Sequence, residues 1–208
     1  MVTKMEAMKN VLQLPGYRVC EYMLVLDPTE ELRERVVKLR EEFQQTYRSN
    51  AVSGRPNIML ASFAQYALME ERLINKLNLV AMGHYPFKVE LKDYGSFPAH
   101  TIYINVVSKS PVQELVKTIR TNAQALMKLH DDRKPYFALE PTMNIAKKLQ
   151  PWQYEKGWLE YAHRHFTGRF IAKEMLLLKR FEGDKHWQVA QHFTFQNLPV
   201  NVKQGELF

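Results

Sequence analysis

The sequence predicts an α+β fold in which two pseudo-twofold-related lobes, built from duplicated β-α-β units with antiparallel sheets, enclose a central cleft. The first half of the chain recurs in the second half with a shift of 83 residues, and each copy has the order strand, helix, strand. The 208 residues are 46% hydrophobic and 25% charged, which is typical of a globular chain. We expect an N-terminal extension over residues 1–16, one bilobal domain over 17–196 and a C-terminal tail over 197–208.

The first copy begins with an apolar run at residues 22–26, which is typical of a strand. Asp27 is predicted to cap the following helix, with Pro28 at the first helical position and Glu30 as the capping-box partner. Apolar residues then recur at helical spacing, and they are Leu32, Val36, Leu39 and Phe43. We expect a further strand over 57–63, a helix over 68–79, and a strand over 87–94 that ends at a turn over 95–98.

The second copy begins with a β-branched strand over 101–107. Ser110, Pro111 and Gln113 are predicted to repeat the helix start of the first copy. The shift of 83 also places Leu32 on Leu115 and Val36 on Ile119, whereas the strand at 57 falls on residue 142 with a shift of 85. Beyond this copy we expect a helix over 153–165 and strands over 169–180 and 187–195, the last two joined by a turn at 182–184.

Two phrases that begin with a proline carry a family resemblance. Residues 56–61 read Pro-Asn-Ile-Met-Leu-Ala, and residues 141–146 read Pro-Thr-Met-Asn-Ile-Ala. Together with the order of elements over residues 17–195, they resemble the 2H phosphoesterases, also called the 2′-5′ RNA ligase-like superfamily. The resemblance implies a His-x-Thr or His-x-Ser motif in each lobe, with one histidine as general base and the other as general acid on a phosphate. In this chain the four motif positions are Asn57, Met59, Thr142 and Asn144.

These substitutions remove the chemistry that the resemblance implies. Histidine suits acid and base catalysis because its pKa lies near neutral pH, and neither Asn57 nor Thr142 can titrate there. Met59 cannot donate a hydrogen bond, although the Asn144 amide can. We therefore predict no catalytic residue, and a ligand-binding cleft lined by the four motif positions, with Asn57 and Thr142 facing each other from central strands of the two lobes. No H-E-x-x-H or paired C-x-x-C motif is present, so we expect no metal site, and we expect no cofactor. Possible supporting residues are Phe63, Lys147, Lys173 and His192.

Two other His-x-Thr triplets begin at His165 and His192, but neither lies in a duplicated strand. Alternation along the last strand predicts that His192 lies on a polar face and that Trp187 and Val189 pack in the core. The alternative left open is that this polar face borders the cleft and uses His192 in binding.

The net charge of +7 favours an anionic partner, here a phosphate-bearing small molecule or an RNA end. The single cysteine, Cys20, fits a reducing compartment, and no apolar run is long enough for a membrane span, so we expect a cytoplasmic protein without a membrane partner. Three functions remain as hypotheses: a 2H-like protein that binds a nucleotide without turnover, a divergent cyclic phosphodiesterase or RNA ligase, and a protein-interaction module. The methionine-rich residues 1–14 are interpreted as a frayed terminus, with a docking segment as the alternative.

Overall fold

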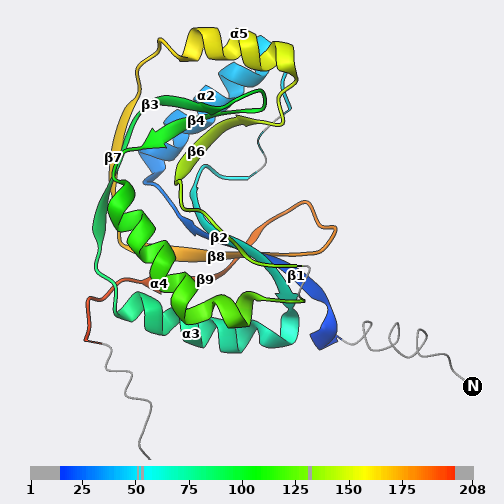
Figure 1. The fold of residues 1–208 in the computed structure, drawn as a ribbon, viewed down its shortest axis with the longest axis vertical. Helices are drawn as coiled ribbons and strands as arrows, with labels where there is room; N and C mark the ends of the chain where they lie inside the picture. Colours follow the sequence, from blue (N-terminus) through cyan, green and yellow to red (C-terminus); the bar gives the residue numbers. More distant parts are fainter. Residues whose placement is uncertain (1–14, 51, 53, 131–132, 200–208) are drawn as a thin grey trace, which may run out of the picture.

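The computed structural model describes residues 15–50, 52, 54–130 and 133–199. The interpretation of residues 1–14 and the prediction for most of the C-terminal tail therefore concern residues outside the described ranges. The chain forms two antiparallel sheets whose outer faces carry the helices (Figure 1). Within the described ranges, no helix is long and apolar enough to cross a membrane.

The larger sheet has five strands in the order β5 (Tyr136–Phe137), β2 (Ile58–Tyr66), β1 (Val19–Leu26), β8 (Glu174–Phe181) and β9 (Gln188–Thr194). The smaller sheet has four strands in the order β6 (Thr142–Lys147), β4 (Thr101–Val106), β3 (Phe87–Phe97) and β7 (Thr167–Ala172). The α-helices are α2 (Glu30–Tyr47), α3 (Glu70–Met82), α4 (Lys109–Met127) and α5 (Pro151–Tyr161), and two short 3-10 helices are η1 (Pro15–Tyr17) and η2 (Ala67–Met69).

Each long helix covers the sheet of the opposite lobe. Helix α2 follows β1 of the larger sheet, yet it packs against β6 of the smaller sheet and against α5. Helix α4 follows β4 of the smaller sheet and packs against β2 and α3, below the larger sheet (Figure 1). The duplicated units are therefore interleaved, and each lobe contains elements from both copies.

The helical stripes predicted from the sequence are the faces that bury these helices. Leu32, Val36 and Phe43 on α2 are at most 3% exposed, and Leu115 and Ile119 on α4 are completely buried. Burying a large aliphatic or aromatic side chain contributes about 1.5–3 kcal/mol each, so these stripes supply most of what holds the helices on the sheets. The predicted duplication of the stripes is confirmed.

The predicted helix caps are wrong, because Asp27 has another partner and Ser110 lies inside its helix. The Asp27 carboxylate pairs with the Arg33 guanidinium at 2.9 Å, and α2 begins at Glu30 after Thr29. Helix α4 begins at Lys109, one residue before the predicted cap, Ser110.

The other cap-related residues also have different roles from those predicted. Pro111 lies in the first turn of α4, where a missing backbone N–H removes no intrahelical bond. The Gln113 side chain donates to the carbonyl of Leu139 rather than closing a capping box.

The strand predicted over residues 169–180 is two strands in different sheets. β7 ends at Ala172 and β8 starts at Glu174, so Lys173 marks the point where the chain crosses from the smaller sheet to the larger one. Helix α5 ends at Tyr161 instead of residue 165, and β5 was not predicted because a two-residue strand has no periodicity to detect. Residues 197 and 198 of the predicted tail donate backbone hydrogen bonds to His84 and Met82 at the end of α3.

Gly157 provides a test of the contact between α2 and α5. A Cβ added there would lie 2.7 Å from the ring of Phe43, closer than any relaxed contact. We expect Gly157→Ala to destabilise the fold by about 1 kcal/mol or more in urea unfolding, because overpacking at about 1–3 kcal/mol exceeds the helix-propensity gain of about 1 kcal/mol. Leu159→Ala, at a position in the same helix that is 73% exposed, is the control. A Gly157→Ala protein as stable as the parent would contradict this packing.

His84 provides a test of burial through pH. The residue is 5% exposed among Tyr85, Phe87 and Phe195, and this burial lowers its pKa, an effect that the charge of Glu114 partly opposes. Below about pH 6.5, His84 binds a proton more readily in the unfolded chain than in the folded one. The free energy of unfolding therefore decreases as the pH falls below about 6.5.

We expect His84→Phe to remove part of the stability loss that the parent protein shows between pH 7.5 and pH 5 in urea unfolding. His163→Asn, at an exposed position, should leave the pH dependence unchanged. Parallel pH profiles for the parent and His84→Phe would show that His84 titrates equally in both states.

Candidate functional site

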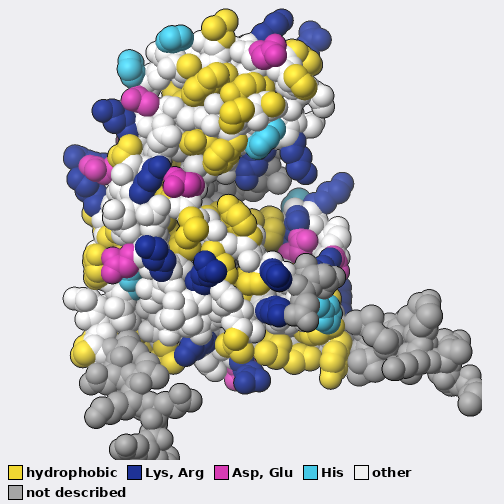
Figure 2. Space-filling model, viewed as in Figure 1, with side chains coloured by type: hydrophobic (Ala, Val, Ile, Leu, Met, Phe, Trp, Pro, Cys, Tyr) yellow, Lys and Arg dark blue, Asp and Glu magenta, His cyan; other side chains and the backbone are white. Residues whose placement is uncertain are grey.

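A cavity of about 610 Å³ lies between the lobes and contains three of the four motif positions. Met59 comes from β2 of the larger sheet, and Thr142 and Asn144 come from β6 of the smaller sheet. Phe97 and Tyr136 also line the cavity, and both are exposed large aromatics. Figure 2 shows lysine and arginine side chains on both sides of the indentation between the lobes.

Strand alternation accounts for the way β6 presents its polar residues. Met143 and Ile145 are at most 1% exposed and face the core, so Thr142 and Asn144 face the cavity. β6 is an edge strand of the smaller sheet, so the expectation that Thr142 lies on a central strand is wrong.

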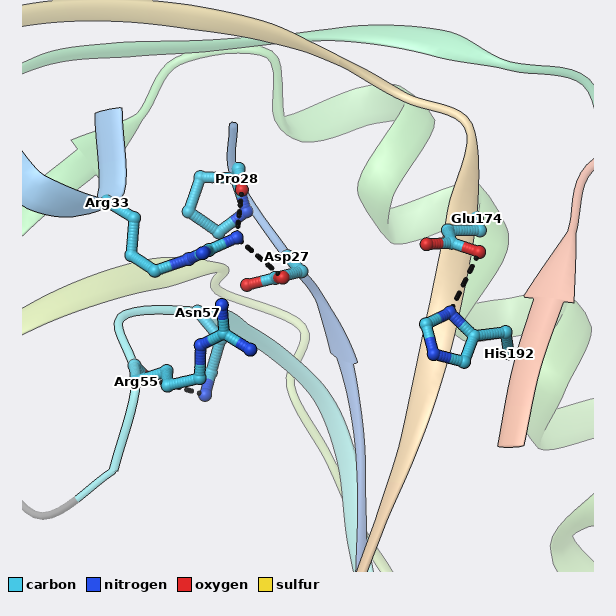
Figure 3. Close-up of polar contacts among 7 residues, drawn as sticks. All are labelled: Asp27, Pro28, Arg33, Arg55, Asn57, Glu174 and His192. Carbon is cyan, nitrogen blue, oxygen red and sulfur yellow. Dashed lines mark hydrogen bonds and ion pairs between the residues drawn. The ribbon is translucent and has the colours of Figure 1, made fainter. Parts of the chain in front are cut away.

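Asn57 is the motif position that does not line this cavity. It lies one residue before β2, is half-buried, and donates from Nδ2 to the carbonyl of Arg55 at 2.9 Å. Figure 3 places it beside Asp27 and Arg33, whose guanidinium also donates to the carbonyl of Pro28 at 3.1 Å. Asn57 and Thr142 are therefore both at the junction of the lobes, but only Thr142 lines the cavity.

Arg40 of α2 connects the two motif segments from behind. Its Nε donates to the backbone carbonyl of Asn144 at 2.9 Å, and its Nη1 donates to the carbonyl of Gly54, before β2, at 3.0 Å. Burial lowers the pKa of Arg40 to about 10. Both of these acceptors are neutral carbonyls, so this guanidinium contributes a positive charge close to the cavity.

Lys147 adds a second cation at the end of β6. Its residue surface is exposed, but desolvation of the ammonium lowers its pKa, and the charges of Arg40 and Lys148 lower the pKa further. Glu140 also lines the cavity, and its carboxylate pairs with Lys109 at 2.7 Å. The charge of Glu140 is therefore neutralised by Lys109, and Arg40 and Lys147 give the site a net positive charge.

The predicted supporting residues are not all brought together. Lys147 lines the cavity, whereas Lys173 lies exposed between β7 and β8, where its carbonyl accepts a bond from Phe195. Phe63 is 7% exposed and stacks on Tyr22 with ring centroids 5.3 Å apart.

His192 lies on β9, three strands from β2 in the same sheet, and its Nδ1 lies 3.1 Å from the Glu174 carboxylate. Figure 3 shows this pair apart from the Asn57 group. Met59 pairs with Val25, Val25 pairs with Leu176, and Leu176 pairs with His192. At about 4.8 Å per strand, His192 therefore lies about 14 Å from Met59.

Sequence reasoning missed Arg40 and Tyr136. A signal for Arg40 was present, because it lies four residues after Val36 and three before Phe43, which places a charge on the buried stripe of α2. Tyr136 belongs to a strand of two residues, and no sequence pattern marked it. Within the part of the chain that the structure describes, no cluster of three or more His, Cys, Asp or Glu side chains could hold a metal ion.

Comparisons with known proteins agree with the fold. The family that matches is the 2′-5′ RNA ligase superfamily, over residues 23–184. None of the curated proteins matches the chain. Among solved structures, Escherichia coli LigT complexed with 3′-AMP has a TM-score of 0.63 at 13% identity, covering 86% of this chain and 98% of LigT.

A second solved structure is TT0787 of Thermus thermophilus, with a TM-score of 0.58 at 16% identity and coverage of 85% of this chain and 98% of that protein. These likenesses confirm the predicted two-lobed α+β fold. The family match over residues 23–184 confirms the resemblance that residues 56–61 and 141–146 carry.

Proposed function

Because the chain belongs to the 2′-5′ RNA ligase superfamily, we propose that it binds a phosphate-bearing ligand, a nucleotide or an RNA end, in the cleft between its lobes without two-histidine catalysis. The observation that carries this proposal is the cavity that joins Met59 to Thr142 and Asn144. LigT, which shares the fold, has been crystallised with 3′-AMP, with ATP and with NADP+. A cytoplasmic location and a single functional domain over residues 17–196 belong to the same proposal.

The chemistry of the cavity suits a phosphate group. Thr142 and Asn144 supply a hydroxyl and an amide that donate without changing protonation state. Arg40 and Lys147 supply charge, and hydrogen bonds to charged groups are about twice as strong as neutral ones. A bound anion would also relieve the burial of the Arg40 cation, whose guanidinium donates to the carbonyls of Asn144 and Gly54.

The same residues argue against the family's two-histidine reaction. A general acid or base works best when its pKa lies near the operating pH, and the motif positions carry Asn, Met, Thr and Asn. Each such group typically contributes about 10²–10⁴-fold in rate. Loss of both therefore leaves a binding site whose donors resemble those of an enzyme but whose proton-transfer groups are missing.

A contact between His100 and Thr101 supports a second candidate function, that of a divergent phosphodiesterase. Thr101 lines the cavity, and its hydroxyl lies 2.6 Å from Nδ1 of His100. A histidine beside a hydroxyl is the arrangement by which enzymes activate an oxygen nucleophile. In this candidate His100 would act as the base that the motif positions no longer supply.

We expect the purified protein to show no hydrolysis of 2′,3′-cyclic nucleotides or 2′-5′-linked RNA above a protein-free control. A companion protein restores the family's His-x-Thr residues at all four motif positions through the changes Asn57→His, Met59→Thr, Thr142→His and Asn144→Thr. Turnover by the parent protein that is lost in His100→Gln would replace our proposal with the second candidate. Turnover that survives His100→Gln would show that another acid and base exist.

The two predicted lysines give a matched test of binding. We expect Lys147→Met to weaken binding of 3′-AMP about tenfold in calorimetry, because one charge-assisted hydrogen bond contributes about 1.5–3 kcal/mol. Lys173→Met makes the same change outside the cavity and should leave the dissociation constant unchanged. The opposite ranking would move the anion site to the crossing between β7 and β8, and a failure of the parent to bind any nucleotide would favour a protein-interaction module.

A further inference from the structure

A second cavity of about 450 Å³ continues the groove along the larger sheet. Met59 and Tyr136 line both cavities, so the two are adjacent rather than separate sites. Ser62 and Ala64 of β2 lie on its lining, and their small side chains leave room above the sheet. None of the four motif positions except Met59 belongs to this second cavity.

The second cavity presents a cation stacked on an aromatic ring. Arg180 of β8 lies 4.5 Å from the ring centroid of Trp187, and its Nε donates to the Glu21 carboxylate. β1 and β8 pair Glu21 directly with Arg180, so this ion pair lies across the sheet and fixes the guanidinium. The guanidinium covers one face of the Trp187 ring, so a base would stack on the opposite face.

A β-bulge explains why Trp187 is not in the core, as alternation along the last strand predicted. Leu177 pairs with Gln191 and Leu178 pairs with Val189, so the register shifts by one residue between them. The shift reverses which side chains face the core, because successive residues of a strand point to opposite faces. Val189 is consequently 46% exposed, and Trp187 lines the groove beside β8.

The charge of the second cavity is positive. Among the lining residues, Arg180 pairs with Glu21, and Arg133 pairs with Glu182, which lies outside the lining. Lys134 also lines the cavity and is exposed. Basic groups combined with aromatic planes are the combination by which proteins hold single-stranded nucleic acid, since phosphates meet the cations and bases stack on the rings.

We infer that the second cavity binds the next nucleotide of a single-stranded oligonucleotide whose phosphate-bearing end occupies the first cavity. This inference rests on the proposed function, because it takes the first cavity as the phosphate site. Trp187 and Tyr136 provide the aromatic surfaces for the second base, and Lys134 provides a cation for the linking phosphate. The protein would then discriminate a strand end from a mononucleotide by length.

Calorimetry with UMP and with a 5′-phosphorylated diuridylate tests this inference. We expect the diuridylate to bind about 5- to 150-fold more tightly, the range that stacking of one base supplies. Trp187→Ala should remove most of this excess and leave UMP binding unchanged. Lys134→Ser should lower the salt slope of diuridylate binding by about one, whereas Lys117→Ser, an equal change at an exposed position on α4, should leave it unaltered.

The possible results separate the two proposals. If UMP binds but the diuridylate binds no more tightly, the second-nucleotide site is overturned and the phosphate site stands. If neither ligand binds, both are overturned. An acidic hexapeptide that binds as tightly as the diuridylate would show that the groove responds to charge alone and would overturn the stacking site. If Trp187→Ala does not fold, an unaltered salt slope in Lys134→Ser overturns the inference by itself.

Discussion

The exchange of helices between the lobes is the constraint on which the cleft depends. Each sheet has one apolar face, and α2 and α4 cover these faces only after crossing to the opposite lobe. The lobes therefore cannot separate without exposing the buried stripes of both helices, each stripe contributing several kcal/mol at about 1.5–3 kcal/mol per large side chain. With the helices on the outer faces, the inner faces of the two sheets are left to form the walls of the groove.

The same crossing places a cation behind the motif strands. Because α2 belongs to one copy and covers the sheet of the other, Arg40 can bond both to Asn144 on β6 and to Gly54 before β2. One guanidinium thus holds together segments from both halves of the chain. A charge at this position costs desolvation, which the lowered pKa of Arg40 reflects, and an anionic ligand would offset that cost.

The sequence was informative where periodicity and duplication applied. The stripes through Leu32 and Leu115 and the order of elements followed from patterns that burial imposes. The placement of Met59, Thr142 and Asn144 on facing lobes came from the duplication and from the family resemblance. The predicted first helical residues, Pro28 and Pro111, were each two residues from the observed starts at Glu30 and Lys109, and the Asp27 carboxylate pairs with Arg33 of α2 instead of capping the helix. The bulge that reverses β9, the crossing at Lys173 and the two-residue β5 depend on distant pairing, which no local pattern encodes.

Asn57 differs from the other three motif positions in its place in the fold, because it does not line the first cavity. An imidazole placed at residue 57 would start from a segment that lies outside the first cavity, beside the ion pair of Asp27 and Arg33. Acid and base catalysis requires both groups within hydrogen-bond reach of the same phosphate. Binding has a weaker requirement, because donors and cations contribute from any side of the anion. Our proposal of binding without turnover rests on this difference, because Thr142, Asn144 and Lys147 line the first cavity and Asn57 does not.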